Sequence, residues 1–162
     1  MNAPSEIDRL VSESIAPLLK SKGFKRRKLA FSRPFENGFD VLVVQKNSWN
    51  SRDDARFTIN LGVYWTEAQK ILGKVTTGIP FSHTNCIVFR RIGFITIPPK
   101  DRWWIVSEDH PVEEIRGDVI FKIEFVTLPW FEKAHELEFS IELVKEYKLI
   151  NHIRALESLR QK

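Results

Sequence analysis

Two adjacent arginines inside an apolar segment are the residues whose type and spacing most suggest chemistry. Neighbouring side chains of a strand point to opposite faces, so either Arg90 or Arg91 should face the core. A buried charge is costly without a partner, and Asp40, Asp101 or a backbone carbonyl could supply one. The functional alternative is an anion clamp, because a guanidinium binds carboxylate or phosphate through two hydrogen bonds.

Two amide side chains on neighbouring expected strands, Gln45 and Asn60, would flank a clamp at Arg91. An enzyme with a pocket around Arg91 and Gln45 is therefore one hypothesis, while hydrogen bonds along the sheet surface explain the same amides without a ligand. A concave site lined by Arg91 with titratable neighbours would favour the pocket. An Arg91 that is paired internally would argue against it.

A cluster of cations without an intervening acid marks the first third of the chain. Its members are Lys20, Lys22, Lys25, Arg26, Arg27, Lys28 and Arg33. Such a cluster can neutralise phosphates, which gives salt-dependent binding to nucleic acid or another polyanion, here through residues 25–28. A solvated helix end followed by an exposed strand explains the same cations, because positive charge stabilises a helix C-terminus.

Three tryptophans are candidates for contact with a ligand or a partner. Trp49 lies in a polar loop expected at 47–55, where an apolar side chain is conspicuous. Trp103 and Trp104 could stack on a base or a ligand ring, but adjacent strand residues face opposite ways, so at least one should anchor the core. We retain Trp49 and Trp103 as candidate binding residues.

Side chains that could hold a metal or act as a nucleophile are few and scattered. His83 and Cys86 have a tolerable spacing, but no second pair of His or Cys residues lies near them in the sequence. A nucleophilic Cys86 would need a neighbouring base and an electropositive site, so we expect a small buried hydrophobe instead. Phosphate-loop and nucleophile-elbow motifs are missing. We therefore expect no catalytic residue, no metal and no cofactor.

The composition fits one globular domain over residues 1–162. Hydrophobic residues make up 43% of the sequence, which allows a substantial core. Apolar runs are too short to span a bilayer, the N-terminus lacks the pattern of a signal peptide, and the single cysteine suits a reducing compartment. We expect a cytoplasmic protein that does not bind membranes.

The net charge of +4 is unevenly distributed along the chain. Residues 1–107 carry a net charge of +8, and residues 108–162 carry −4. This asymmetry indicates either an anionic partner for the basic part or two surfaces that attract each other within one fold.

Alternating apolar residues predict a sheet in the middle of the chain. The third expected strand has a large apolar residue at every second position, which defines a core face and makes the strand half-buried. These residues are Phe57, Ile59, Leu61, Val63 and Trp65. Before it, strands at 29–35 and 39–46 should form a hairpin with Asn37-Gly38 as a turn of positive φ. Pro34 cannot donate to a ladder, so its strand should lie at an edge or contain a bulge.

Helical periodicity predicts an amphipathic helix from about residue 5 to residue 21, kinked at Pro17 and stopped by Gly23. The other expected elements are a short helix at 66–72, an irregular segment at 74–85, a β-rich segment at 86–97, a strand at 102–106 and a helix at 147–159. Two further segments, 112–127 and 136–146, fit helix and strand alike. In 136–146 the alternation favours a strand, whereas the glutamates favour a helix.

Six short motifs occur in order along the chain. They are Lys22-Gly23-Phe24-Lys25, Val43-Val44-Gln45-Lys46, Phe57-Thr58-Ile59-Asn60-Leu61-Gly62-Val63-Tyr64, Arg91-Ile92-Gly93, Asp101-Arg102-Trp103-Trp104 and Leu128-Pro129-Trp130-Phe131. Over roughly residues 7–143, their order and spacing resemble the bacterial family called domain of unknown function 4304. The resemblance implies an α+β fold and favours helix for both ambiguous segments. It offers no catalytic residues, because the family is uncharacterised.

We therefore expect an α+β domain with an N-terminal kinked helix, an antiparallel sheet of about five strands and C-terminal helices packed on the sheet. The expected function is non-enzymatic binding, on the helix-free face or a loop edge, with another protein as the partner, as in immunity or antitoxin proteins. Nucleic-acid or polyanion binding by the basic segment 20–33 and an enzyme pocket around Arg91 are the alternatives.

Overall fold

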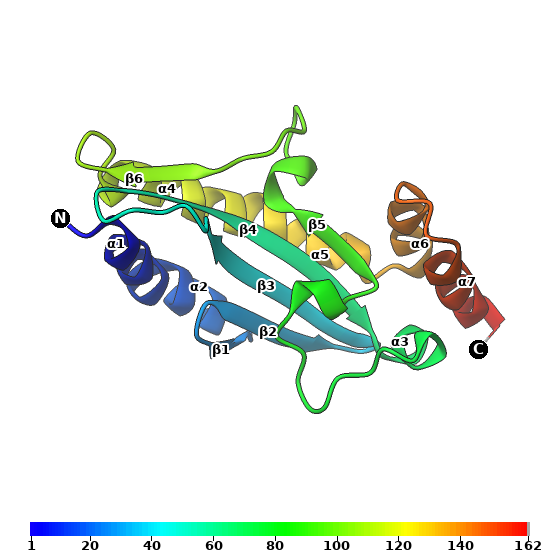
Figure 1. The fold of residues 1–162 in the computed structure, drawn as a ribbon. Coiled ribbons are helices and arrows are strands. Elements are labelled where there is room, and N and C mark those ends of the chain that lie inside the picture. The colour runs from blue at the N-terminus through cyan, green and yellow to red at the C-terminus, as the bar shows by residue number, and fades with distance from the viewer. Residues whose placement is uncertain (162) are drawn as a thin grey trace.

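The computed structural model describes residues 1–161 and shows helices packed against an antiparallel sheet (Figure 1). Within these residues the sheet has six strands: β1 Lys25–Arg27, β2 Ala30–Phe35, β3 Gly38–Lys46, β4 Asp54–Trp65, β5 Val88–Arg91 and β6 Trp104–Ser107. The order is β1-β2-β3-β4-β5, and β6 also pairs with β4, so β5 and β6 share one side of that long strand. The expected α+β class with an antiparallel sheet is confirmed.

The helices flank one face and one end of the sheet. They are α1 Ala3–Leu10, α2 Ala16–Ser21, α3 Thr66–Leu72, α4 Val112–Lys122, α5 Leu128–Ala134, α6 Leu137–Lys145 and α7 Ile150–Glu157, with 3₁₀ turns at His83–Asn85, Ile92–Ile95 and Ser158–Gln161. In Figure 1, α4 and α5 run behind the sheet, α1 and α2 lie at its left-hand end, and α6 and α7 lie at its right-hand end. The segment at 74–87, which precedes β5, crosses in front of the sheet in Figure 1.

The N-terminal helix continues through Pro17 as expected. A π-helical turn, Val11–Ile15, joins α1 to α2 immediately before the proline, where the backbone lacks one N–H donor. Gly23 then takes a φ of +92°, and the N–H of Phe24 donates to the carbonyl of Leu19 at 3.0 Å. The left-handed glycine thus ends the helix and turns the chain into β1.

Strand β4 is buried on both faces, which corrects the expectation of a half-buried strand. The predicted core face is buried against the helices, and Trp65 donates from Nε1 to Ser140 Oγ in α6 at 3.2 Å. On the opposite face Thr58, Asn60 and Tyr64 are buried as well. The reason is a second cover that the sequence pattern does not reveal.

That cover is the irregular segment at 74–87. Its Cys86 lies over Gly62, where an added Cβ would come within 2.6 Å of the Cys86 sulfur. The N–H of Thr76 donates to the Tyr64 hydroxyl at 3.0 Å, and Gln69 holds both ends of the segment by donating to the carbonyls of Lys74 and Asn85. The helix-free face is therefore only partly open to a partner.

The β2–β3 hairpin exists, but its turn differs from the prediction. Phe35 pairs with Gly38, so the turn residues are Glu36 and Asn37, and Gly38 is the first residue of β3. Neither Asn37 nor Gly38 has positive φ. Gly38 is required for another reason: an added Cβ would lie 1.7 Å from the carbonyl oxygen of Tyr64 on β4.

Other local predictions are confirmed in part. Strand β1 was not expected; it pairs with the first half of β2 only, which leaves Pro34 beyond its end. The β-rich segment at 86–97 yields a strand only at Val88–Arg91, after which the chain forms a 3₁₀ turn. Both ambiguous C-terminal segments are helical, and in α6 the buried Ser140, Ile141 and Val144 recur with the helical period.

Candidate functional site

A chain of polar contacts joins three of the predicted site residues on the helix-free face. Asn60 donates from Nδ2 to Gln45 at 2.5 Å and accepts from Arg91 Nε at 3.3 Å. Arg91 Nη1 donates to both carboxylate oxygens of Asp101 at 3.1 and 3.0 Å, and Trp103 Nε1 donates to the same carboxylate at 3.1 Å. The Arg91 guanidinium also lies 5.1 Å from the Trp103 ring centroid. The structure therefore brings Gln45, Arg91 and Trp103 together.

The neighbouring Arg90 is the arginine that faces the core. Its side chain is 6% exposed and donates to the carbonyls of Phe89 and Leu143 and to the Glu146 carboxylate at 2.9 Å. It also stacks 4.1 Å from the Tyr147 ring centroid. Arg90 is thus a satisfied structural residue that ties β5 to the C-terminal end of α6.

A surface groove of about 720 Å³, the Arg91 groove, lies beside this polar chain. Its lining residues are Asn60, His83, Phe89, Arg90, Arg91, Phe94, Pro99, Glu146 and Tyr147. Burial lowers the pKa of His83, and the nearby Arg91 charge lowers it further. Burial also raises the pKa of Tyr147. Arg91 therefore both lines a concave site with titratable neighbours and carries an internal partner.

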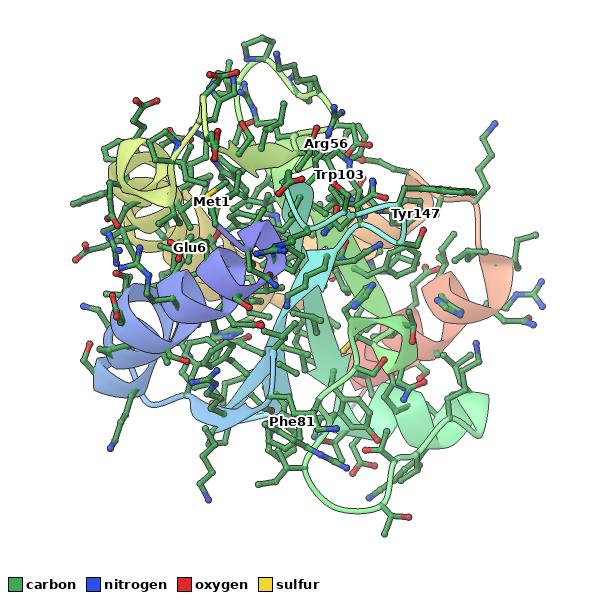
Figure 2. All side chains as sticks on the ribbon, turned by 60° about the vertical axis from the view of Figure 1, so that its left-hand side comes forward. Met1, Glu6, Arg56, Phe81, Trp103 and Tyr147 are labelled. Carbon is green, nitrogen blue, oxygen red and sulfur yellow. The ribbon has the colours of Figure 1, made fainter. Side chains whose placement is uncertain are left out.

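The predicted basic segment forms the outer edge of the sheet. Lys25, Arg26 and Arg27 of β1 are exposed, and Lys28 follows in a left-handed turn. In the part of the chain that the structure describes, none of these four forms an ion pair with an acid. Arg27 lies 5.8 Å from the ring of Phe81, which Figure 2 shows far from Trp103 on the molecule. A second groove of about 500 Å³ separates this edge from residues 76–85.

Trp49 stands apart from the other candidates. It is 91% exposed in the loop between β3 and β4, and its backbone N–H donates to Asn47 Oδ1 at 2.8 Å. Trp104, which we did not retain as a candidate, is buried against Phe57 and donates to Asp118. The pair of adjacent tryptophans is therefore split between the core and the helix-free face.

An apolar surface that sequence reasoning missed runs along α4 and the π-helical turn Ile123–Thr127 that follows it. Phe121 and Phe125 are 56% and 60% exposed, with ring centroids 5.1 Å apart, and Ile97 beside them is 96% exposed. With Pro129 and Phe139 they line a groove of about 510 Å³, and we call these five residues the apolar patch. Val119 of α4 and Ile123 of the turn after it are buried, so the pattern Phe121/Phe125 indicates a second apolar face only once a helix is assumed.

A buried ionic network also escaped the sequence analysis. Asp40 is fully buried; it accepts two hydrogen bonds from Arg33, at 3.0 and 2.8 Å, and its other oxygen lies 2.7 Å from His135 Nε2. Phe35 stacks on the His135 ring at 4.0 Å. No local sequence motif indicates this network, because His135 lies far from Asp40 in the sequence.

Among residues 1–161, no cluster of three or more His, Cys, Asp or Glu side chains is arranged to hold a metal ion. Cys86 is buried, and burial raises the pKa of its thiol. The helices in the described part of the chain are too short or too polar to cross a membrane.

Comparison with known proteins gives one match. A family model described as Domain of unknown function (DUF4304) matches residues 15–133. No curated protein and no solved structure matches the chain.

Proposed function

The chain belongs to this family of unknown function, and we propose that it is a non-enzymatic protein-binding module whose partner docks on the apolar patch. The observation that carries the proposal is the exposure of Phe121, Phe125 and Ile97 side by side. Soluble proteins rarely leave large apolar side chains contiguous on the surface unless something covers them.

The rim of the apolar patch suggests the chemistry of the partner. Arg102 and Lys133 line the same groove; Arg102 donates to Thr96, and Lys133 lies 6.0 Å from the Phe139 ring. In the described residues neither cation forms an ion pair with an acid. The partner that fits is a protein segment with apolar anchors flanked by acidic residues.

A bacterial cytoplasm and an immunity or antitoxin-like role are part of the same proposal. Support for the location comes from the single cysteine, which is buried. Support for the role is the association of an exposed docking surface with a chain that shows no catalytic signature.

The test compares two surface variants of the full chain. Phe121→Ser/Phe125→Ser removes the centre of the apolar patch, and Ile150→Ser is the matched control, because Ile150 is 60% exposed on α7. A partner captured from host extract is purified, and its affinity is measured by calorimetry. We expect the double variant to weaken binding at least tenfold, as removal of two central aromatic anchors does, and the control to bind normally.

Equal binding of the double variant would reject the apolar patch as the docking site. Failure to capture a stoichiometric protein would reject the protein-binding function itself. Light scattering tests a third case: a wild-type dimer that dissociates in the double variant would mean that a second copy covers the patch, which also rejects a separate partner.

A polyanion is the second candidate ligand, favoured by the unpaired cations of β1. In the folded chain Arg33 forms an ion pair with Asp40, whereas residues 25–28 have no acidic partner among the described residues. They lie beside a groove lined by Thr76, Ser82 and Phe81. Hydroxyls, cations and an aromatic ring suit a single-stranded nucleic acid.

Fluorescence anisotropy with a labelled single-stranded oligonucleotide tests this candidate. Binding should weaken steeply with salt, and Arg27→Ala/Lys28→Ala should flatten the slope of log affinity against log salt by about 1.4, at about 0.7 for each phosphate that is no longer neutralised. Lys70→Ala is the control, because Lys70 already pairs with Glu67. Absence of binding at low salt would eliminate the candidate.

A further inference from the structure

The Arg91 groove is separate from the apolar patch, and its lining combines positive charge with aromatic walls. Arg90 and Arg91 contribute two positive charges, and Glu146 contributes one negative charge. Glu146 Oε2 accepts a hydrogen bond from Arg90 at 2.9 Å. Arg91 uses Nε for Asn60 and Nη1 for Asp101, and no described residue accepts a hydrogen bond from its Nη2. Arg91 thus lines a concave site with the Nη2 group of its guanidinium unpaired.

His83 supplies a second donor in the same groove. Its Nδ1 is buried without a hydrogen-bond partner in the described part of the chain. Buried N–H groups without an acceptor are rarer than buried acceptors without a donor, so we assign the proton to Nε2. Nε2 is not among the buried unpartnered atoms and makes no hydrogen bond with the described residues, so it is available to a ligand.

Aromatic side chains form the rest of the groove. Phe89 and Tyr147 stack in parallel, with ring centroids 4.7 Å apart, and the Tyr147 hydroxyl donates to the Phe89 carbonyl at 2.7 Å. Phe94 is 51% exposed and lines the same groove. Rigid aromatic walls next to cationic donors are the features of a site for a flat molecule that carries an anion.

We infer that the Arg91 groove binds a small aromatic carboxylate. The carboxylate accepts hydrogen bonds from Arg91 Nη2 and His83 Nε2, and the ring of the ligand packs against Phe94 and the Phe89/Tyr147 stack. This inference is independent of the protein-binding proposal, because none of these residues belongs to the apolar patch.

The experiment titrates the full chain with 2-naphthoate by calorimetry. 2-Naphthalenemethanol is the probe without charge, and cyclohexanecarboxylate is the probe without an aromatic ring. The variants are Arg91→Gln, His83→Phe and Phe94→Ser. Arg56→Gln is the matched control, because Arg56 lies on the neighbouring strand β4, is half exposed and does not line the groove.

We expect 2-naphthoate to bind and both other probes to bind at least tenfold more weakly. Arg91→Gln and His83→Phe should each weaken 2-naphthoate binding about tenfold, the effect of one hydrogen bond to a charged group. Phe94→Ser retains both donors and should weaken binding because the ring of the ligand no longer packs against an aromatic wall. Because Phe94 is exposed, this variant tests the site even if a substitution at Arg91 prevents folding.

Three results would overturn the inference. They are absence of 2-naphthoate binding at millimolar concentration, equal affinity for the uncharged probe, and unchanged affinity in the groove variants. If Phe121→Ser/Phe125→Ser abolishes binding while the groove variants do not, the probe occupies the apolar patch and the inference is wrong.

Discussion

The carboxylate of Asp40 is the most demanding single group in the molecule, because it is ionisable and has no exposed surface. Its charge is compensated by Arg33, whose guanidinium also lies 4.7 Å from the Phe24 ring, and by the hydrogen bond to His135. Removing one member of a buried ionic network leaves the others uncompensated. The network therefore fixes α5 to the β2–β3 hairpin.

Asp40→Asn keeps the shape of the side chain but removes its charge. We expect the free energy of unfolding in urea to fall by about 3 kcal/mol, the cost of breaking a buried ion pair. Asp53→Asn is the control; Asp53 is exposed in the β3–β4 loop, so its change should stay within about 0.5 kcal/mol. Equal stability of the two variants would show that Asp40 does not hold the hairpin.

The lowered pKa of His83 predicts a stability that depends on pH. Above the ordinary value of 6.5 the imidazole is neutral in the folded and unfolded states, so it contributes no pH dependence. Below 6.5 the unfolded state binds the proton first, so the free energy of unfolding should fall as the pH decreases toward the lowered folded pKa. His83→Phe should reduce this slope in urea titrations between pH 7 and pH 5.

Part of the slope should remain in His83→Phe, because burial also lowers the pKa of His152. The double variant His83→Phe/His152→Phe should therefore be flatter than either single variant. A slope that is unchanged in His83→Phe would contradict the burial of the imidazole.

Two glycines in different elements should respond oppositely to the same substitution. Gly38 opens β3 under the Tyr64 carbonyl, where an added Cβ would collide at 1.7 Å, so Gly38→Ala should cost about 1–3 kcal/mol or more. Gly117 lies in α4 with no atom within 4 Å of an added Cβ, so Gly117→Ala should gain about 0.4–1 kcal/mol. Thermal unfolding followed by circular dichroism measures both, and a neutral Gly38→Ala would reject the close approach of β3 and β4.

The elements show which kinds of sequence signal suffice for prediction. Alternation predicted the core face of β4, and Gly73 ended the helix at 66–72 with a φ of +69°, because both signals are local. The cover over the opposite face was not predictable, since it depends on Gly62 admitting Cys86 from a segment without regular structure. The turn before Gly38 was misassigned for the same reason: the glycine serves a neighbouring strand rather than its own backbone.

The candidate sites also combine local signals, which the sequence shows, with contacts between distant segments, which it does not show. Adjacent Arg90 and Arg91 in a strand must point to opposite faces, so the sequence predicts that one is internal, and Arg90 is the internal residue. Asp101 and a backbone carbonyl were among the partners that the sequence suggested, and both are found. Glu146 was not predicted, because it approaches Arg90 only after the C-terminal helices have folded. The apolar patch was hidden because residues 112–127 fit helix and strand equally well.

For the whole molecule, the uneven charge is partly neutralised by folding. Arg9 pairs with Glu113, Arg33 with Glu132 and Arg90 with Glu146, so basic and acidic parts of the sequence attract each other across the fold. The cations of β1 are left out of this compensation. Attraction between two surfaces of one fold therefore accounts for part of the asymmetry, and an anionic partner for the cations of β1 stays a prediction.

The C-terminal helices provide a test of whether the entire chain unfolds as one unit. The family match ends at residue 133, yet Leu156 of α7 is fully buried in the same core cluster as Ile7 of α1. Leu156→Ala should therefore cost about 2–5 kcal/mol, whereas Ile150→Ala, at an exposed position on the same helix, should change stability by less than about 0.5 kcal/mol.

The decisive observation for this prediction is whether two probes of unfolding coincide. Circular dichroism reports all helices, while tryptophan fluorescence includes Trp65 on β4 and Trp104 on β6, both buried in the core. In a single cooperative unit, Leu156→Ala shifts both urea transitions to the same lower midpoint, because weaker packing of α7 is felt by the sheet through Trp65 and α6. If the helical signal disappears first while tryptophan fluorescence keeps the wild-type midpoint, then α6 and α7 form a separate unit, and the expectation of one domain over residues 1–162 is wrong.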